Sequence, residues 1–116
     1  MTVQRYQIST RFSEICVHGN TVYLAGQVPD VTEGRDCADQ ARQVFASIDA
    51  LLAEVGSDKS KMLQVTVWLT DMANYDAFNE QWDAWLSGVP APARACTQAR
   101  LAVDGYLVEV LVVAAL

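Results

Sequence analysis

Residues Tyr106–Leu116 read YLVEVLVVAAL, and this stretch decides the fold because its aliphatic run predicts a buried strand. Glu109 is the only charged residue in the stretch. Because strand side chains alternate between two faces, Glu109 shares its face with three aliphatic residues, Leu107, Leu111 and Val113. Burying an unpaired carboxylate costs free energy, so this residue needs either a partner or a function.

Upstream, residues 89–101 read VPAPARACTQARL, which predicts a second strand with isolated positive charges. On this strand Arg94, Cys96, Gln98 and Arg100 share one face if no bulge intervenes. A turn at residues 102–105 then joins the two strands in a hairpin, with Gln98 opposite Glu109. We therefore expect both strands to contribute to one polar patch in an apolar sheet.

Two interpretations of Arg94 and Glu109 follow from physics alone. In the first they form a buried or interfacial ion pair, although desolvation costs several kcal/mol per ion and makes such pairs poor stabilisers. In the second, Arg94 binds the carboxylate of a ligand, since its planar donors bind a carboxylate in bidentate fashion. The residues themselves favour neither interpretation.

The preceding part of the chain predicts strands, then a helix. EICVH and TVYLAG flank Gly19-Asn20, a dipeptide suited to a two-residue hairpin turn, and residues 3–8 form a possible earlier strand. Residues 26–36 read as a loop. From about Arg35, apolar residues recur every three or four positions, which predicts an amphipathic helix that stops at Gly56.

A second strand-and-helix pair follows. MLQVTVWLT, residues 62–70, alternates and predicts a strand with one apolar face, made of Leu63, Val65, Val67 and Leu69. Residues 71–88 return to helical spacing with an aromatic stripe, for which core packing is favoured over a ligand platform. The members of the stripe are Tyr75, Phe78, Trp82 and Trp85.

The predicted order is β-β-α-β-α-β-β, an α+β fold in a single domain over residues 1–116. Two amphipathic helices cover only one face of a mixed sheet. The strands are too apolar for the other face to stay bare, so we expect a symmetric oligomer that packs sheets together.

Composition excludes several functions. The net charge is −6 and the eight Lys and Arg residues form no run, which argues against a nucleic-acid partner. Three cysteines without C-x-x-C spacing and one histidine disfavour a zinc site and a disulfide framework. The sequence has no membrane span or signal-peptide pattern, so we expect a cytoplasmic protein.

Four segments together resemble the Rid family, the YjgF-type enamine and imine deaminases. They are AGQVP at 25–29, NEQWDAW at 79–85, PARAC at 92–96 and YLVEVLVVAA at 106–115. The resemblance spans nearly the whole chain and implies a chorismate-mutase-like fold, assembled as a homotrimer with active sites between subunits. It implies hydrolysis of reactive 2-imino or enamino acids to 2-keto acids and ammonia, without metal or cofactor.

The resemblance also implies roles for individual residues. Arg94 binds the substrate carboxylate, the backbone carbonyl of Cys96 orients the attacking water, and Glu109 holds or activates that water. Asn79 lies near the cleft, and Gly26 lets the backbone approach the ligand. In an apolar strand the pKa of Glu109 is expected to rise by desolvation, partly offset by Arg94, which suits proton transfer near neutral pH.

The chain departs from the family pattern at three places. Phe12 stands where many relatives carry a tyrosine near the substrate, Ala25 replaces a common serine, and the segment from Cys96 to Arg100 is one residue shorter. The differences at Phe12 and Ala25 favour one alternative, a non-catalytic trimer that senses small carboxylates such as 2-keto acids. A separate alternative is a protein-interaction or holdase role that uses apolar surface. The roles of Arg5 and Arg100 stay open.

Overall fold

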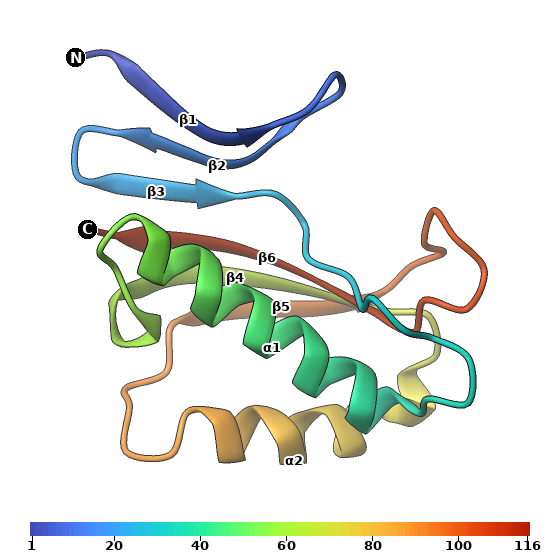
Figure 1. The fold of residues 1–116 in the computed structure, drawn as a ribbon. Coiled ribbons are helices and arrows are strands. Elements are labelled where there is room, and N and C mark those ends of the chain that lie inside the picture. Colours follow the sequence, from blue (N-terminus) through green and yellow to red (C-terminus); the bar gives the residue numbers. More distant parts are fainter.

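Six strands form one mixed sheet in the order β1-β2-β3-β6-β4-β5 in the computed structural model, which describes residues 1–116 (Figure 1). The strands are β1 Val3–Ile8, β2 Ser13–His18, β3 Thr21–Leu24, β4 Met62–Leu69, β5 Ala93–Gln98 and β6 Val108–Ala115. The predicted fold class is confirmed, and the possible earlier strand is present as β1. The chain therefore begins with three strands rather than two.

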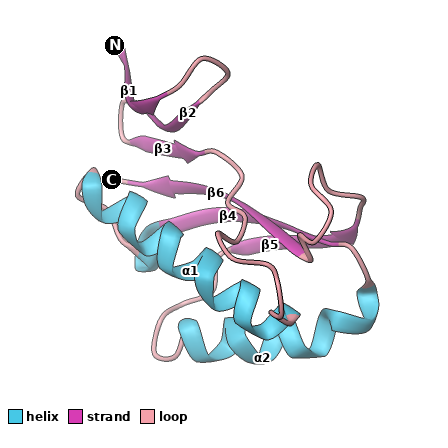
Figure 2. Ribbon diagram, turned by 45° about the vertical axis from the view of Figure 1, so that its right-hand side comes forward, coloured by secondary structure: helices cyan, strands magenta, loops and turns pink.

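Two α-helices, α1 Cys37–Glu54 and α2 Tyr75–Trp85, lie side by side on one face of the sheet (Figure 2). Short 3-10 turns at Lys59–Lys61 and Met72–Asn74 lead into β4 and α2. A single cluster of 22 buried apolar residues fills the space between helices and sheet. Neither helix combines the length and apolar composition that crossing a membrane requires.

Local signals placed the hairpin and the first helix correctly. His18 pairs with Thr21 across the β2–β3 turn, where Gly19 takes a φ of 60° that favours glycine. The Asp36 side chain accepts a hydrogen bond from the Asp39 N–H and caps the start of α1. The helix ends before Gly56, which has a φ of 79°.

The predicted hairpin between the last two strands is wrong. Strand β5 pairs in parallel with β4, and β6 pairs antiparallel with the opposite edge of β4. Trp68 therefore lies between Thr97 and Glu109, while Gln98 pairs with Leu69. The reason is the β4–α2–β5 crossover, a connection that makes its two strands parallel and leaves the other edge of β4 to β6.

The predicted apolar face of β4 is wrong at one position. The register against β6 shifts between Met62 and Gln64, which marks a bulge at Leu63. Met62 consequently turns into the core at 7% exposure, whereas Leu63 is 51% exposed. Beyond the bulge the alternation holds, and Val65, Val67 and Leu69 are fully buried.

No helix covers the second face of the sheet (Figure 2). Its side chains alternate along the strands with the core residues and are half-buried or exposed. They include Cys16, Tyr23, Trp68, Leu111 and Val113. This open face carries aromatic and aliphatic groups that water covers poorly.

Because of the bulge, replacing leucine by alanine should lower the free energy of unfolding by different amounts at Leu69 and Leu63. Leu69→Ala removes a fully buried side chain and should lower the free energy of unfolding by about 2–5 kcal/mol. Leu63→Ala, the matched control, should lower it by less than about 1 kcal/mol. Denaturant unfolding monitored by tryptophan fluorescence measures both; equal losses would contradict the bulge.

Candidate functional site

Arg94 extends from β5 toward the helices, because it pairs with the core residue Val65 and shares its face. Its guanidinium carbon lies 4.9 Å from the Trp82 ring centroid and 5.9 Å from those of Phe78 and Tyr75. Nη2 donates a hydrogen bond of 3.3 Å to the Tyr75 hydroxyl. The core prediction is confirmed for Phe78 and Trp82, whereas Tyr75 is exposed. These three rings also hold the guanidinium.

The other terminal nitrogen of Arg94, Nη1, is buried and has no hydrogen-bond partner. The ion pairs of the chain join Asp39 to Arg35 and Arg42, so the ion-pair interpretation of Arg94 and Glu109 is wrong for a single chain. A buried guanidinium N–H without an acceptor is costly. Arg94 is thus held in place with one donor unsatisfied.

Asn79 contributes a second unsatisfied group. Its Oδ1 is buried without a partner, and the residue lies one helical turn after Tyr75 on α2. The structure therefore places an unsatisfied acceptor on the same helix that seats Arg94. Sequence reasoning missed Tyr75 as a guanidinium contact, although its spacing from Phe78 and Trp82 was the available signal.

Cys96 presents its backbone at a free sheet edge. The Ala99 N–H donates to the Leu69 carbonyl over 3.0 Å, so alternate residues of β5 turn their backbone groups toward β4. The N–H and C=O of Cys96 consequently point outward from this edge strand. Its side chain faces the helices, where burial raises the pKa of the thiol and Arg94 offsets part of the rise.

Glu109 lies on the open face against Gly26. A Cβ at Gly26 would lie 3.0 Å from Cδ of Glu109 and closer still to its Oε2, so only glycine allows this approach. Desolvation raises the pKa of the Glu109 carboxyl above its ordinary value. No side chain hydrogen-bonds to this carboxylate.

Arg94 and Glu109 point to opposite faces of the sheet, so the single polar patch predicted from the sequence is wrong. Arg94 lies on the helix-covered face beside Val65, and Glu109 lies on the open face beside Trp68. The sequence argument placed both in one hairpin, whereas β4 separates their strands. Within one chain these two groups do not reach the same small ligand.

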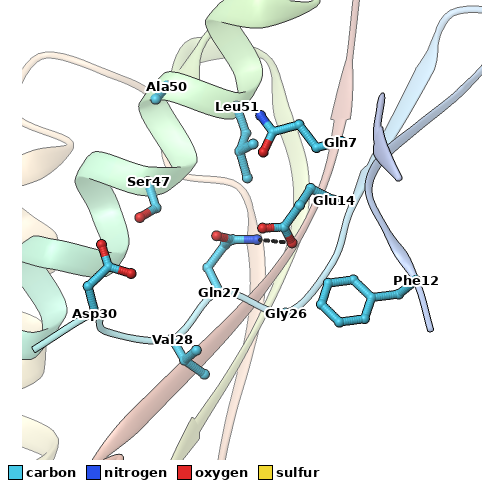
Figure 3. Close-up of a pocket in the computed structure, with 10 residues that line it drawn as sticks. All are labelled: Gln7, Phe12, Glu14, Gly26, Gln27, Val28, Asp30, Ser47, Ala50 and Leu51. Atoms are coloured by element: carbon cyan, nitrogen blue, oxygen red, sulfur yellow. Dashed lines mark hydrogen bonds between the residues drawn. The ribbon is translucent and has the colours of Figure 1, made fainter. Parts of the chain in front are cut away.

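Two cavities adjoin the remaining candidate residues. Phe12 and Gly26 line a cavity of about 340 Å³ between α1, the β1–β2 hairpin and residues 26–30 (Figure 3). Arg100 lines a smaller one, about 180 Å³, together with Trp68 and Glu109. Sequence reasoning left the role of Arg100 open, and its place beside Glu109 gives it access to the same space. Arg5 pairs with Cys16 on β1 and lines neither cavity.

Comparison with known proteins finds close likenesses over the whole chain. The family model described as Endoribonuclease L-PSP matches residues 2–116. A RutC family protein of Haemophilus influenzae is 41% identical over 114 residues, 98% of each chain.

Two solved structures have the same fold. A member of the YjgF protein family from Neisseria meningitidis superposes with a TM-score of 0.94 at 38% identity, covering 99% of this chain and 95% of its own. A protein of the Rid family from Yersinia pestis superposes with a TM-score of 0.88 at 29% identity, covering 94% and 90%.

The raised pKa of Glu109 predicts a pH-dependent effect of Glu109→Gln. Between the unfolded and folded pKa the folded chain binds more protons, so the free energy of unfolding falls as pH rises through that window. Glu109→Gln should therefore be more stable than wild type at pH 7, with the difference vanishing below about pH 4.

Thermal unfolding across pH at one protein concentration measures this effect. Glu80→Gln, at an exposed carboxylate of α2, is the matched control and should show little difference. A Glu109→Gln protein that is less stable than wild type at pH 7 would contradict the desolvation argument.

Proposed function

This chain belongs to the Endoribonuclease L-PSP family, which includes proteins named YjgF, RutC and Rid, and we propose that it hydrolyses reactive 2-imino and enamino acids. The products are 2-keto acids and ammonia. An imine is already electrophilic, so the reaction needs positioned water, a proton acceptor and a grip on the substrate.

The unsatisfied Nη1 of Arg94 carries this proposal. The guanidinium lies against three aromatic rings of α2, keeps one buried nitrogen without an acceptor, and has no anionic partner within the chain. A substrate carboxylate supplies the acceptor in charge-assisted form, the strongest kind of hydrogen bond available to it. Asn79, with its free Oδ1, offers an acceptor to a donor on the same ligand.

The complete site requires two copies of the chain in this proposal. Arg94 and Cys96 lie on the edge strand β5, and Asn79 lies on α2, the helix that contacts Arg94, whereas Gly26 and Glu109 meet on the open face. A homotrimer, typical of the family resembled, would cover the apolar open face of each copy and bring these half-sites together. The substrate carboxylate then meets Arg94 of one copy while Glu109 of another faces the imine carbon.

The chemistry follows from these groups without a cofactor. The outward-facing Cys96 carbonyl and Glu109 hold a water, and ionised Glu109 removes its proton as oxygen attacks the imine carbon. Glu109 then returns a proton to nitrogen. The product of this addition is a carbinolamine, and when Glu109 carries its remaining hydroxyl proton to nitrogen, the C–N bond breaks, ammonia leaves and the 2-keto acid forms. Desolvation raises the pKa of Glu109 above its ordinary value, which makes its carboxylate a better proton acceptor for this exchange.

The name of the family model also raises RNA cleavage. The net charge of −6 offers no basic surface to neutralise phosphates, and this disfavours RNA as substrate.

Carboxylate binding without turnover is the second candidate function. It is favoured by Phe12, which is 56% exposed and provides no hydroxyl at the cavity that Gly26 also lines. In this second function Arg94 binds the carboxylate of a 2-keto acid, and the protein acts as a sensor.

Ammonia release from freshly generated 2-iminobutanoate tests the proposed activity. Wild type should accelerate it over buffer, and Arg94→Ala should lower kcat/KM by about a hundred-fold or more, because a charged hydrogen-bond pair is lost. Arg42→Ala, at an exposed arginine of α1, is the control and should keep full activity. Saturable 2-keto acid binding without turnover would favour the sensor instead.

Mixed oligomers test the shared site. Arg94→Ala and Glu109→Gln, carrying different tags and produced together, should each be inactive alone. In purified trimers that contain both variants about one site in three combines an intact Arg94 with an intact Glu109 from different copies, so activity should return to about a third of wild type. No recovery in purified mixed trimers would show that both groups act from one chain.

A further inference from the structure

The larger cavity presents hydrogen-bond acceptors on several sides. Its volume of about 340 Å³ is within the range of small-ligand pockets. Glu14 from β2, Gln27 and Asp30 from the segment after β3, and Ser47 from α1 line it, and no Lys or Arg does (Figure 3). The cavity therefore suits a ligand that donates hydrogen bonds and carries positive charge.

The orientation of Gln27 is dictated by its neighbours. Its Nε2 donates to the Ala25 carbonyl at 3.0 Å and to Oε1 of Glu14 at 3.5 Å, and both partners are acceptors. The amide therefore cannot turn over without losing both bonds. Gln27 is only 6% exposed, and its Oε1 points into the cavity toward α1 without a hydrogen bond (Figure 3).

Gln7 repeats this arrangement at the rim. Its Nε2 donates to Oε1 of Glu54 over 3.2 Å, which leaves the amide oxygen as the group available to the cavity. The carboxylate of Asp30 and the hydroxyl of Ser47 make no hydrogen bonds within the chain. Gln27 as a residue is more than nine-tenths buried, and its amide oxygen, which has no partner in the chain and lies beside two carboxylates, can accept from a donor outside the protein.

The ligand chemistry is that of an organic cation rather than a metal ion. No three His, Cys, Asp or Glu side chains gather as a metal site requires. The exposed Phe12 ring at the cavity offers an aromatic surface, which attracts ammonium and guanidinium groups.

We propose that this cavity binds an ammonium or guanidinium group, and that the preferred substrates are 2-imino acids with a cationic side chain. The link to substrate rests on the proposed function, because Gly26 lines the cavity and also contacts Glu109. A substrate held at Glu109 then extends its side chain past Gly26 toward Gln27 and Asp30.

The preference for a cationic side chain is tested with two imines, which an amino-acid oxidase makes in the assay from arginine and from citrulline. The two side chains have similar shape, and only the arginine side chain is charged. Wild type should favour the arginine imine by about ten-fold in kcat/KM, the value of one charged hydrogen bond. Asp30→Asn should remove most of that preference by lowering kcat/KM for the arginine imine much more than for the citrulline imine.

Asp83→Asn, which removes the same charge from the exposed face of α2, is the matched control and should change neither rate. Equal rates for the two imines in wild type, or an unchanged preference in Asp30→Asn, would overturn the proposed substrate class. If neither imine is accelerated, the deaminase function itself fails.

Binding of agmatine, a guanidinium compound without a carboxylate, tests the cavity independently of catalysis. Calorimetry should detect saturable binding that Asp30→Asn weakens about ten-fold and that Arg94→Ala leaves unchanged. Absence of agmatine binding, or its displacement by millimolar Mg²⁺ or Ca²⁺ at constant ionic strength, would overturn the organic-cation site whatever the imine assay shows.

Discussion

The position of β4 between β5 and β6 is the constraint that governs what one chain can do. It sets Arg94 and Glu109 two strands apart, and the alternation of side chains then turns them to opposite faces. Neither residue can compensate for the charge of the other. Each remains unpaired in its own environment, one beneath the helices and one on the bare face. A second copy, rather than a rearrangement of the chain, is the simplest way to bring them together.

The seat of Arg94 shows how a buried cation is tolerated without a counter-ion. Contact with the Trp82 ring is worth up to about 2 kcal/mol when desolvated, and the Tyr75 hydroxyl satisfies one donor. These gains do not match the desolvation cost of a full charge, which is several kcal/mol. The aromatic rings therefore orient the guanidinium without fully stabilising it, and the remaining deficit favours binding of an anion.

Much of the fold could be predicted because its signals are local. The turn at Gly19 and the helix stop at Gly56 depend on φ angles that glycine adopts freely, and helical periodicity marks α1. Strand partners could not be predicted in the same way. Pairing of β6 with β4 rather than β5 depends on the crossover through α2, and nothing in the alternating pattern of β4 reveals the bulge at Leu63. The candidate site residues were identified by resemblance, but their faces depend on that pairing.

Four polar groups lack a hydrogen-bond partner within the chain. Arg94 on the edge strand β5 and Asn79 on α2 each keep a buried polar atom without a protein partner. Glu109 on the open face and the amide oxygen of Gln27 at the larger cavity also make no hydrogen bond within the chain. Glu109 and Gln27 each line a cavity, where a ligand can reach them. The core, in contrast, is an uninterrupted cluster of apolar side chains. A binding function requires polar groups without partners at sites that a ligand or a second copy can reach, because only an external partner can supply the missing hydrogen bonds.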